Sequence, residues 1–119
     1  MNREDLKIRT KRFAHDCVKF AIGLPENTLG RHLKGQLIRA STSVAANYRA
    51  ACIAQSKKTF IAKLSIVIEE IDESHFWIEF AQDEHLLPEK ICEPLKKEAK
   101  ELTLIFAASR RTANLSLNK

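Results

Sequence analysis

Glycine and proline are scarce in this chain, with three of each among 119 residues. Because an all-β domain of this size needs many turns built from these residues, their scarcity favours a few long helices. No apolar run is long enough to span a bilayer. The N-terminal stretch MNREDLKIRTKR is highly charged and lacks the apolar core of a secretory signal. These absences predict an all-α, cytoplasmic protein without a membrane segment.

The residue combinations that catalysis requires are also missing. Di-iron four-helix bundles use Glu-x-x-His pairs, whereas this chain has only an Asp-x-x-His, Asp72 with His75. There is no nucleophile elbow, P-loop or glycine-rich cradle. The cysteines Cys17, Cys52 and Cys92 are odd in number and far apart, which favours reduced, buried thiols. We therefore expect no enzymatic activity, no metal site and no cofactor.

Four segments show the three-or-four-residue apolar spacing of amphipathic helices. The first stripe is Leu6, Phe13, Cys17, Phe20 and Leu24; the second is Leu33, Leu37, Ala40, Val44, Tyr48, Ala51 and Ile53 or Ala54. The third is Phe60, Leu64, Val67, Ile71, Ser74 or His75, and Ile78; the fourth is Ile91, Leu95, Leu102, Ile105 or Phe106, and Ser109.

The predicted helices cover about 3–22, 31–54, 56–84 and 88–113. The segment GLPENTLG separates the first two, Ser56 suits the N-cap of the third, and Pro88 suits the first turn of the fourth. Short connections make consecutive helices antiparallel neighbours. The sequence therefore predicts one domain, 1–119, folded as an antiparallel up-down-up-down four-helix bundle.

The stretch QLIRASTSVAANYRAA, residues 36–51, places hydroxyl and amide side chains inside the second predicted helix. Serine and threonine can donate back to the preceding turn, so this composition does not require a loop. If helices two and three pair about a turn near residues 55–56, Arg39 lies opposite Asp72 and can form an ion pair with Glu69 or Glu73. Such a pair is either a solvated surface contact or, if partly buried, a contact that fixes the register of the two helices. Asn47 then lies near Leu64, either in a packing layer or facing a neighbouring subunit. We expect the small residues to permit close helix packing.

Charge is distributed unevenly along the chain, whose formal net charge is +5. No acidic residue occurs between Glu26 and Glu69, whereas eleven occur from Glu69 to Glu101. A basic segment of this kind can contact phosphates. Alternatively, it is simply solvated, or it meets the acidic half of a neighbouring copy. No RNA-binding motif or aromatic stacking platform is evident. The nucleic-acid-binding candidates are Arg31, Lys34, Arg49, Lys57, Lys58 and Lys63.

The adjacent aromatic residues Phe76 and Trp77 cannot both point into the core of a bundle helix. We expect one of them to pack inside and the other to cover a subunit interface, where aromatic residues are enriched. The alternative is that both are partly buried within one protomer.

QLIRASTSVAANYRAA and FIAKLSIVIEEIDESHFWIE together resemble the bacterial four-helix-bundle family encoded by intervening sequences in large-subunit ribosomal RNA genes. That family is also similar to the accessory variability determinants of diversity-generating retroelements. Ala50 departs from the family, which often has Glu there. Among the matching positions, a structural or interface role is expected for Arg39, Asn47, Tyr48, Glu70, Glu73, Phe76 and Trp77.

The resemblance implies a homopentamer of four-helix protomers without a defined enzyme activity. Its retroelement relatives bind a reverse transcriptase and nucleic acid. The first functional hypothesis is therefore an accessory protein that binds RNA or DNA through a basic surface. The second is a scaffold or adaptor for a protein partner, such as a reverse transcriptase, without nucleic-acid affinity of its own.

Overall fold

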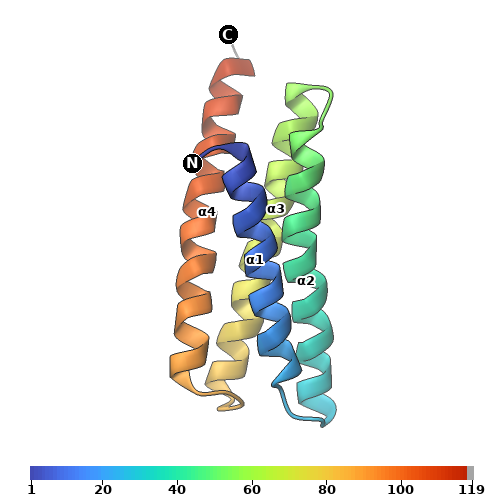
Figure 1. The fold of residues 1–119 in the computed structure, drawn as a ribbon, viewed down its shortest axis with the longest axis vertical. Coiled ribbons are helices and arrows are strands. Elements are labelled where there is room, and N and C mark those ends of the chain that lie inside the picture. Colours follow the sequence, from blue (N-terminus) through green and yellow to red (C-terminus); the bar gives the residue numbers. More distant parts are fainter. Residues whose placement is uncertain (118–119) are drawn as a thin grey trace.

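The computed structural model describes residues 1–117, which form four helices and, within that range, no strand (Figure 1). This confirms the all-α prediction. The helices are α1 (Arg3–Ile22), α2 (Thr28–Cys52), α3 (Lys57–Asp83) and α4 (Glu89–Leu117).

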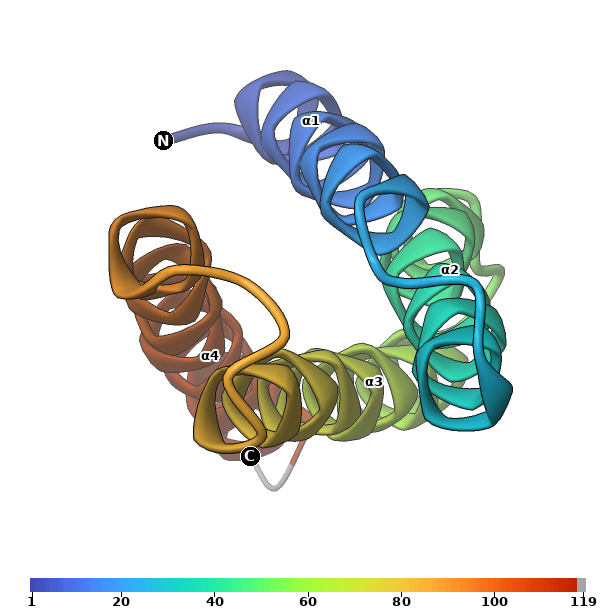
Figure 2. The ribbon, with the colours of Figure 1, turned by 90° about the horizontal axis from the view of Figure 1, so that it is seen from below.

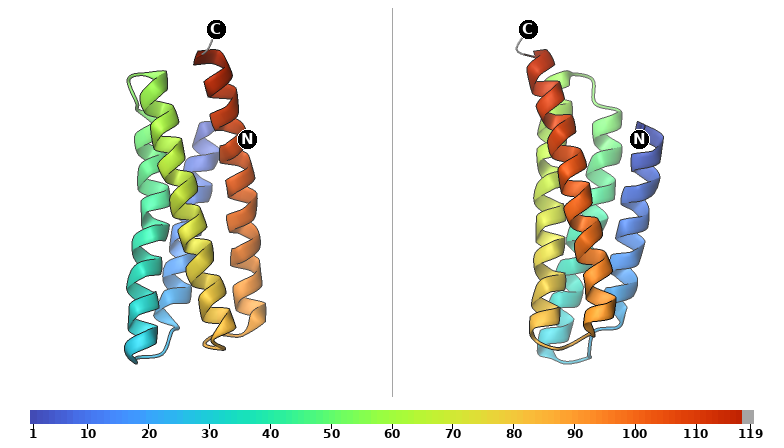
Figure 3. Two further views of the ribbon diagram at one scale, coloured as in Figure 1. Left: turned by 180° about the vertical axis from the view of Figure 1, so that it is seen from behind. Right: turned by 90° about the vertical axis from the view of Figure 1, so that its left-hand side faces the viewer.

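The helices lie side by side along one long axis, and the molecule measures 51 × 21 × 21 Å. The α1–α2 and α3–α4 connections lie at one end of the bundle, and the α2–α3 connection lies at the other (Figures 1 and 3). Viewed along the axis, the helices follow one another in chain order (Figure 2). The start of α1, the end of α2, the start of α3 and the end of α4 therefore lie toward the same end.

Each helix contributes one buried stripe to a common core, which includes Phe13, Leu37, Ile71 and Phe106. Most of the predicted apolar positions are buried, and burial of this surface is the main force that holds the helices together. Two candidate positions are wrong. Ile53 lies beyond the end of α2. Ile91 is exposed because the buried stripe of α4 begins at the next residue, Cys92, and adjacent residues point about 100° apart around a helix.

α2 begins three residues earlier than predicted. The side chain of Asn27 is its N-cap and accepts a hydrogen bond from the backbone N–H of Gly30 at 2.8 Å. The prediction treated Gly30 as part of the connection, whereas this glycine lies in the first turn of the helix.

The ends of α3 have clear local causes. Ser56 is the N-cap, as the sequence predicts, and accepts from the backbone N–H of Thr59 at 3.1 Å. At the other end His85 has φ 57°, the left-handed conformation that commonly terminates helices. Pro88 lies just before α4 rather than within it, and α4 extends to Leu117, beyond the predicted residue 113.

α1 and α4 are joined by an ion-pair network. The Arg9 guanidinium donates to Glu98 at 2.6 and 2.8 Å and to Glu101 at 2.8 Å. These hydrogen bonds raise the pKa of Arg9.

None of the helices formed by residues 1–117 combines the length and apolar character needed to cross a membrane.

Candidate nucleic-acid interface

The start of α1, the end of α2, the start of α3 and the end of α4 meet at the end of the bundle that holds the α2–α3 connection (Figure 1). Each of these helix ends carries lysine or arginine residues. Contacts between the helices fix this arrangement. Arg3 lies over the ring of Phe60 at 4.8 Å, Lys57 donates to Ser116, and Arg110 donates to Ser65 at 3.2 Å. We call this surface the basic end and define it as Arg3, Lys7, Lys11, Arg49, Lys57, Lys58, Lys63, Arg110 and Arg111.

Few carboxylates oppose these cations. Residues 27–68 and 102–117 contain no acidic residue. The acids near these cations are therefore Glu4 and Asp5 of α1, together with Glu98 and Glu101 of α4, which are held by Arg9. Glu4 pairs with Lys7 at 2.9 Å, and Asp5 belongs to the capping box at the start of α1. The basic end therefore carries a large excess of positive charge, which attracts polyanions.

The structure divides the six residues predicted to bind nucleic acid. Arg49, Lys57 and Lys58 are exposed at the basic end, and Lys63 is half-buried beside them. Arg31 and Lys34 lie in the first turns of α2, at the opposite end of the bundle. The prediction grouped them because they are close in sequence, but α2 carries Arg31 about 27 Å away from Arg49.

Local pairing also distinguishes Lys34 from the basic end. Its ammonium group pairs with Glu26, and the resulting hydrogen bond lowers the pKa of the Glu26 carboxyl. This cation is already partly neutralised in the folded chain. Arg31 and Lys34 therefore do not belong to the candidate interface.

The cations that α1 and α4 contribute to the basic end were not predicted from the sequence. A hollow of about 510 Å³ lies between α1 and α2, and a second of about 320 Å³ lies on α4. The available signal was the absence of acids after Glu101, which marks the last turns of α4 as basic. The first hollow is lined by Lys7, Ile8, Lys11, Ala45, Ala46 and Arg49, and the second by Ala107, Arg110, Arg111, Asn114 and Leu115.

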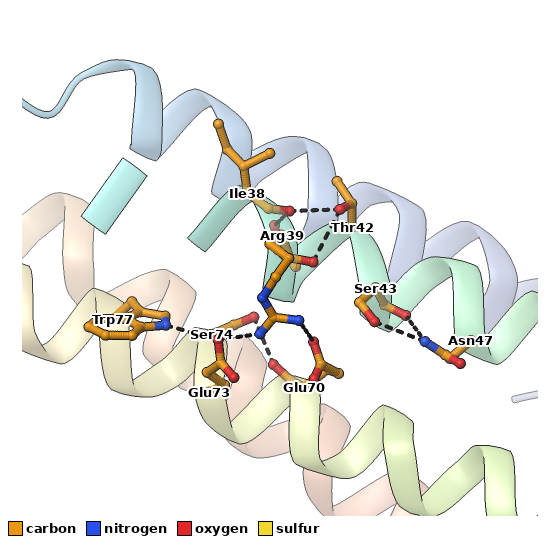
Figure 4. Close-up of polar contacts among 10 residues, drawn as sticks. Ile38, Arg39, Thr42, Ser43, Asn47, Glu70, Glu73, Ser74 and Trp77 are labelled. Atoms are coloured by element: carbon orange, nitrogen blue, oxygen red, sulfur yellow. Dashed lines mark hydrogen bonds and ion pairs between the residues drawn. The ribbon is translucent and has the colours of Figure 1, made fainter. Parts of the chain in front are cut away.

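Arg39 links α2 to α3 midway along the bundle (Figure 4). Its guanidinium donates to Glu70 at 3.0 Å and to Glu73. The predicted partner Glu73 is therefore correct, and Glu70 takes the place expected for Glu69. Trp77 also donates its indole N–H to Glu73 at 3.1 Å. Although burial favours the neutral acid, the hydrogen bonds from Trp77 and Arg39 hold the pKa of Glu73 below its ordinary value.

The hydroxyl-rich stretch of α2 is helical, and its polar groups bond back along the helix. Thr42 donates to the carbonyl of Ile38 at 2.7 Å, and the Asn47 amide donates to Ser43 at 2.8 and 3.0 Å (Figure 4). Tyr48 is buried, with its ring 4.9 Å from that of Phe106. Thr42, Ser43 and Asn47 thus find hydrogen-bonding partners within α2 itself.

Replacing Arg39 with alanine should lower the free energy of unfolding by about 1 kcal/mol, the upper end for exposed ion pairs. Arg39 bridges two carboxylates, and the substitution would leave Glu70, whose side chain is only 15% exposed, without a partner. This corresponds to a melting temperature lower by about 4 °C. Thermal unfolding followed by circular dichroism measures the change.

The control is Lys34→Ala, which removes a cation paired with the 71% exposed Glu26 and should change stability by less than about 0.5 kcal/mol. Because the folded-state pKa of Glu73 is lowered, the contribution of Arg39 is present at neutral pH. It should disappear as acidification protonates Glu73. If Arg39→Ala and Lys34→Ala lowered the free energy of unfolding equally at neutral pH, Arg39 would not be needed to fix the register of α2 and α3.

Burial raises the pKa values of the Cys17 and Cys92 thiols, and both stay protonated at neutral pH. All three cysteines are free, although Cys52 is only half-buried rather than a core residue. Among residues 1–117, no group of three or more His, Cys, Asp or Glu side chains is arranged to hold a metal ion.

Comparison with known proteins gives a family but no described activity. No curated protein matches the chain. A solved protein of unknown function from Bacteroides thetaiotaomicron, assigned to the S23 ribosomal protein family, is 26% identical and superposes with a TM-score of 0.79. The match covers 87% of this chain and 96% of that one. The family model described as 23S rRNA-intervening sequence protein matches residues 4–108, so the chain belongs to that family.

Proposed function

We propose that this chain is a non-enzymatic accessory protein that binds RNA or DNA through the basic end of an antiparallel up-down-up-down bundle. The observation that carries the proposal is the gathering of cations from all four helices at one end, where few carboxylates oppose them. Lysine and arginine in this arrangement contact phosphates without reading base sequence. Binding should therefore be tolerant of sequence and strongly dependent on salt.

Assembly strengthens the electrostatic argument. We propose a cytoplasmic homo-oligomer, with five copies as the family resemblance implies. Repetition around a ring would join the basic ends into one positive band. From the sequence resemblance to accessory variability determinants, we also propose a reverse transcriptase as a candidate protein partner. Light scattering after size exclusion, with and without a mixed RNA/DNA ligand at two salt concentrations, measures both the subunit number and the mass gained.

Replacing Lys57, Lys58 and Lys63 together with alanine should flatten the salt dependence of nucleic-acid binding. If each lysine contacts one phosphate, the slope of log affinity against log salt should fall by about 2 to 3. Fluorescence anisotropy of labelled single-stranded RNA, duplex RNA and duplex DNA at several salt concentrations gives the slope.

The matched control is Lys90→Ala, Lys97→Ala and Lys100→Ala, three exposed lysines in the first half of α4. It removes the same amount of charge from the opposite end of the bundle. Equal slopes for the two triple variants would show that net charge, and not the basic end, governs binding. Absence of binding by the unaltered protein at low salt would refute the proposed function.

A second candidate function is a scaffold or adaptor without nucleic-acid affinity. The observation that favours it is the incomplete burial of two aromatic rings on α3, Phe76 and Phe80, which are 48% and 38% exposed. They lie in the half of α3 remote from the basic end. A surface of this kind is characteristic of protein contacts.

A further inference from the structure

The outer face of α3 carries a row in which two exposed aromatic rings lie between carboxylates. Positions three or four apart on a helix share one face. The row is exposed along its whole length, which is about 21 Å. We call it the aromatic–acidic strip and define it as Glu69, Asp72, Phe76, Phe80 and Asp83.

The rings of the strip form one connected cluster. The ring centroids of Phe76 and Phe80 are 5.9 Å apart, and Phe76 lies 4.9 Å from Trp77. Trp77 is half-buried and packs against the hydrophobic core, and its ring also contacts that of the exposed His32 of α2, at 5.5 Å. Trp77 therefore connects the exposed rings to the protein interior, whereas Phe76 and Phe80 present an apolar surface that no part of residues 1–117 covers.

The carboxylates of the strip have no cationic partner in the part of the chain that the structure describes. Within residues 1–117, none of Glu69, Asp72 and Asp83 takes part in a salt bridge, and the same holds for the exposed Glu79 beside them. From residue 64 to residue 83, α3 contains no lysine or arginine. The strip thus combines apolar surface with uncompensated negative charge.

The cations nearest the strip do not neutralise it. Arg39 on the α2 side is held by Glu70 and Glu73. On the α4 side, Lys96 donates to Gln82 and Glu93. Lys100 lies on the same side and lines a hollow together with Asp72, but it forms no salt bridge within residues 1–117.

That hollow, of about 360 Å³, adjoins the strip between α3 and α4. Ala99, Thr103 and Leu104 give it an apolar wall, and Leu104 is 72% exposed. His75 also lines it, and the buried Nε2 atom of this residue has no hydrogen-bonding partner within residues 1–117. The hollow is large enough to accept an aliphatic side chain from a molecule lying on the strip.

We propose that the aromatic–acidic strip binds a cationic amphipathic helix of another protein. Leucine-like side chains of that helix would cover Phe76 and Phe80 and enter the hollow beside Asp72. Its lysine or arginine side chains would meet the free carboxylates and the ring faces, which attract cations. An acidic or uncharged helix would leave the same carboxylates uncompensated. This proposal does not depend on nucleic-acid binding by the basic end.

The single tryptophan of the chain provides a direct measurement, because Trp77 contacts both exposed rings. The probe is a synthetic helical peptide of about 18 residues, roughly 27 Å long, with leucine on one face and lysine elsewhere. Titration should change Trp77 emission and reach saturation. A peptide with glutamate in place of lysine should not bind, and neither should one with serine in place of leucine.

Two variants locate the peptide on the strip. Phe76→Ala with Phe80→Ala, and Glu69→Lys with Asp72→Lys, should each weaken binding about tenfold or more. The control Ile53→Ala with Leu115→Ala removes exposed apolar side chains near the other end and should bind normally. Since all these positions are exposed, each variant should keep the helical circular dichroism of the parent. If a variant itself changes the emission of Trp77, the affinity is measured with a labelled peptide instead.

Several results would overturn the proposal. Equal affinity for the lysine and glutamate peptides would remove the role of the carboxylates. Normal binding by both strip variants would place the peptide elsewhere. A third possibility is that a second copy of this chain covers the strip. In that case the unaltered protein sediments as an assembly that does not bind the peptide, and Phe76→Ala with Phe80→Ala dissociates that assembly.

Discussion

Replacing Phe106 with alanine should lower the free energy of unfolding by about 3 to 5 kcal/mol, the range for deleting a fully buried aromatic side chain. Phe106 is completely buried in α4, and its ring contacts Tyr48 of α2. The substitution therefore opens a cavity between helices that are not neighbours in sequence. Because domains are typically stable by only 5 to 15 kcal/mol, roughly, the loss should be a large fraction of the total.

Urea unfolding followed by circular dichroism measures this change, with Leu104→Ala as the control. Leu104 lies two residues earlier on the same helix and is 72% exposed, so its truncation should cost less than about 0.5 kcal/mol. The two substitutions remove large apolar side chains from one helix and differ chiefly in burial. Similar losses for both would contradict the placement of Phe106 in the core.

The contrast between these two residues also shows why much of the fold could be predicted. Phe106 lies four residues after Leu102, and both are buried, whereas Leu104 lies on the opposite face of α4. Apolar spacing reports which side of a helix is buried without any knowledge of its neighbours. The spacing fails at helix ends, where Ile53 and Ile91 have the right character but lie outside the helix or out of phase with its buried stripe.

The candidate interface was less predictable, because it depends on which helix ends meet. Arg49 and Lys57 are eight positions apart in the chain and are together in the structure, so proximity in sequence identified them. Arg110 and Arg111 reach the same end only because α4 runs back along the whole bundle. Conversely, Arg31 belongs to the same basic segment of sequence but lies near the start of α2, at the other end of the bundle. Charge patterning gives the sign of a segment, whereas helix length and direction decide where that charge lies.

The aromatic pair on α3 was predicted in part. One ring was expected to pack inside and the other to cover a subunit interface, and the structure has Trp77 half-buried and Phe76 exposed. The place of Phe80 beside Phe76 was not predicted, because the two residues are four positions apart and share one face of the helix without being adjacent in sequence. The subunit interface itself stays a prediction.

Replacing Gly30 with alanine should destabilise the protein by about 3 kcal/mol, the upper part of the range for inserting an atom into a packed site. A Cβ at this position would lie 1.8 Å from the carbonyl oxygen of Pro25 and 2.8 Å from its carbonyl carbon. These are backbone atoms, so no side-chain rotation relieves the overlap. Either the α1–α2 connection shifts or the first turn of α2 unwinds, with loss of the cap that Asn27 forms.

The matched control is Gly35→Ala on the same helix, where a Cβ would have no atom within 4 Å. This substitution should stabilise the protein by about 0.5 to 1 kcal/mol, because alanine has the better helix propensity. Two chemically identical changes, five residues apart, are thus expected to have opposite signs. Urea unfolding of both variants tests this, and a stabilising Gly30→Ala would show that the connection does not approach α2 so closely. The opposite signs follow from position alone: Gly30 is required by the contact between two backbone segments, whereas Gly35 lies on the open surface of α2.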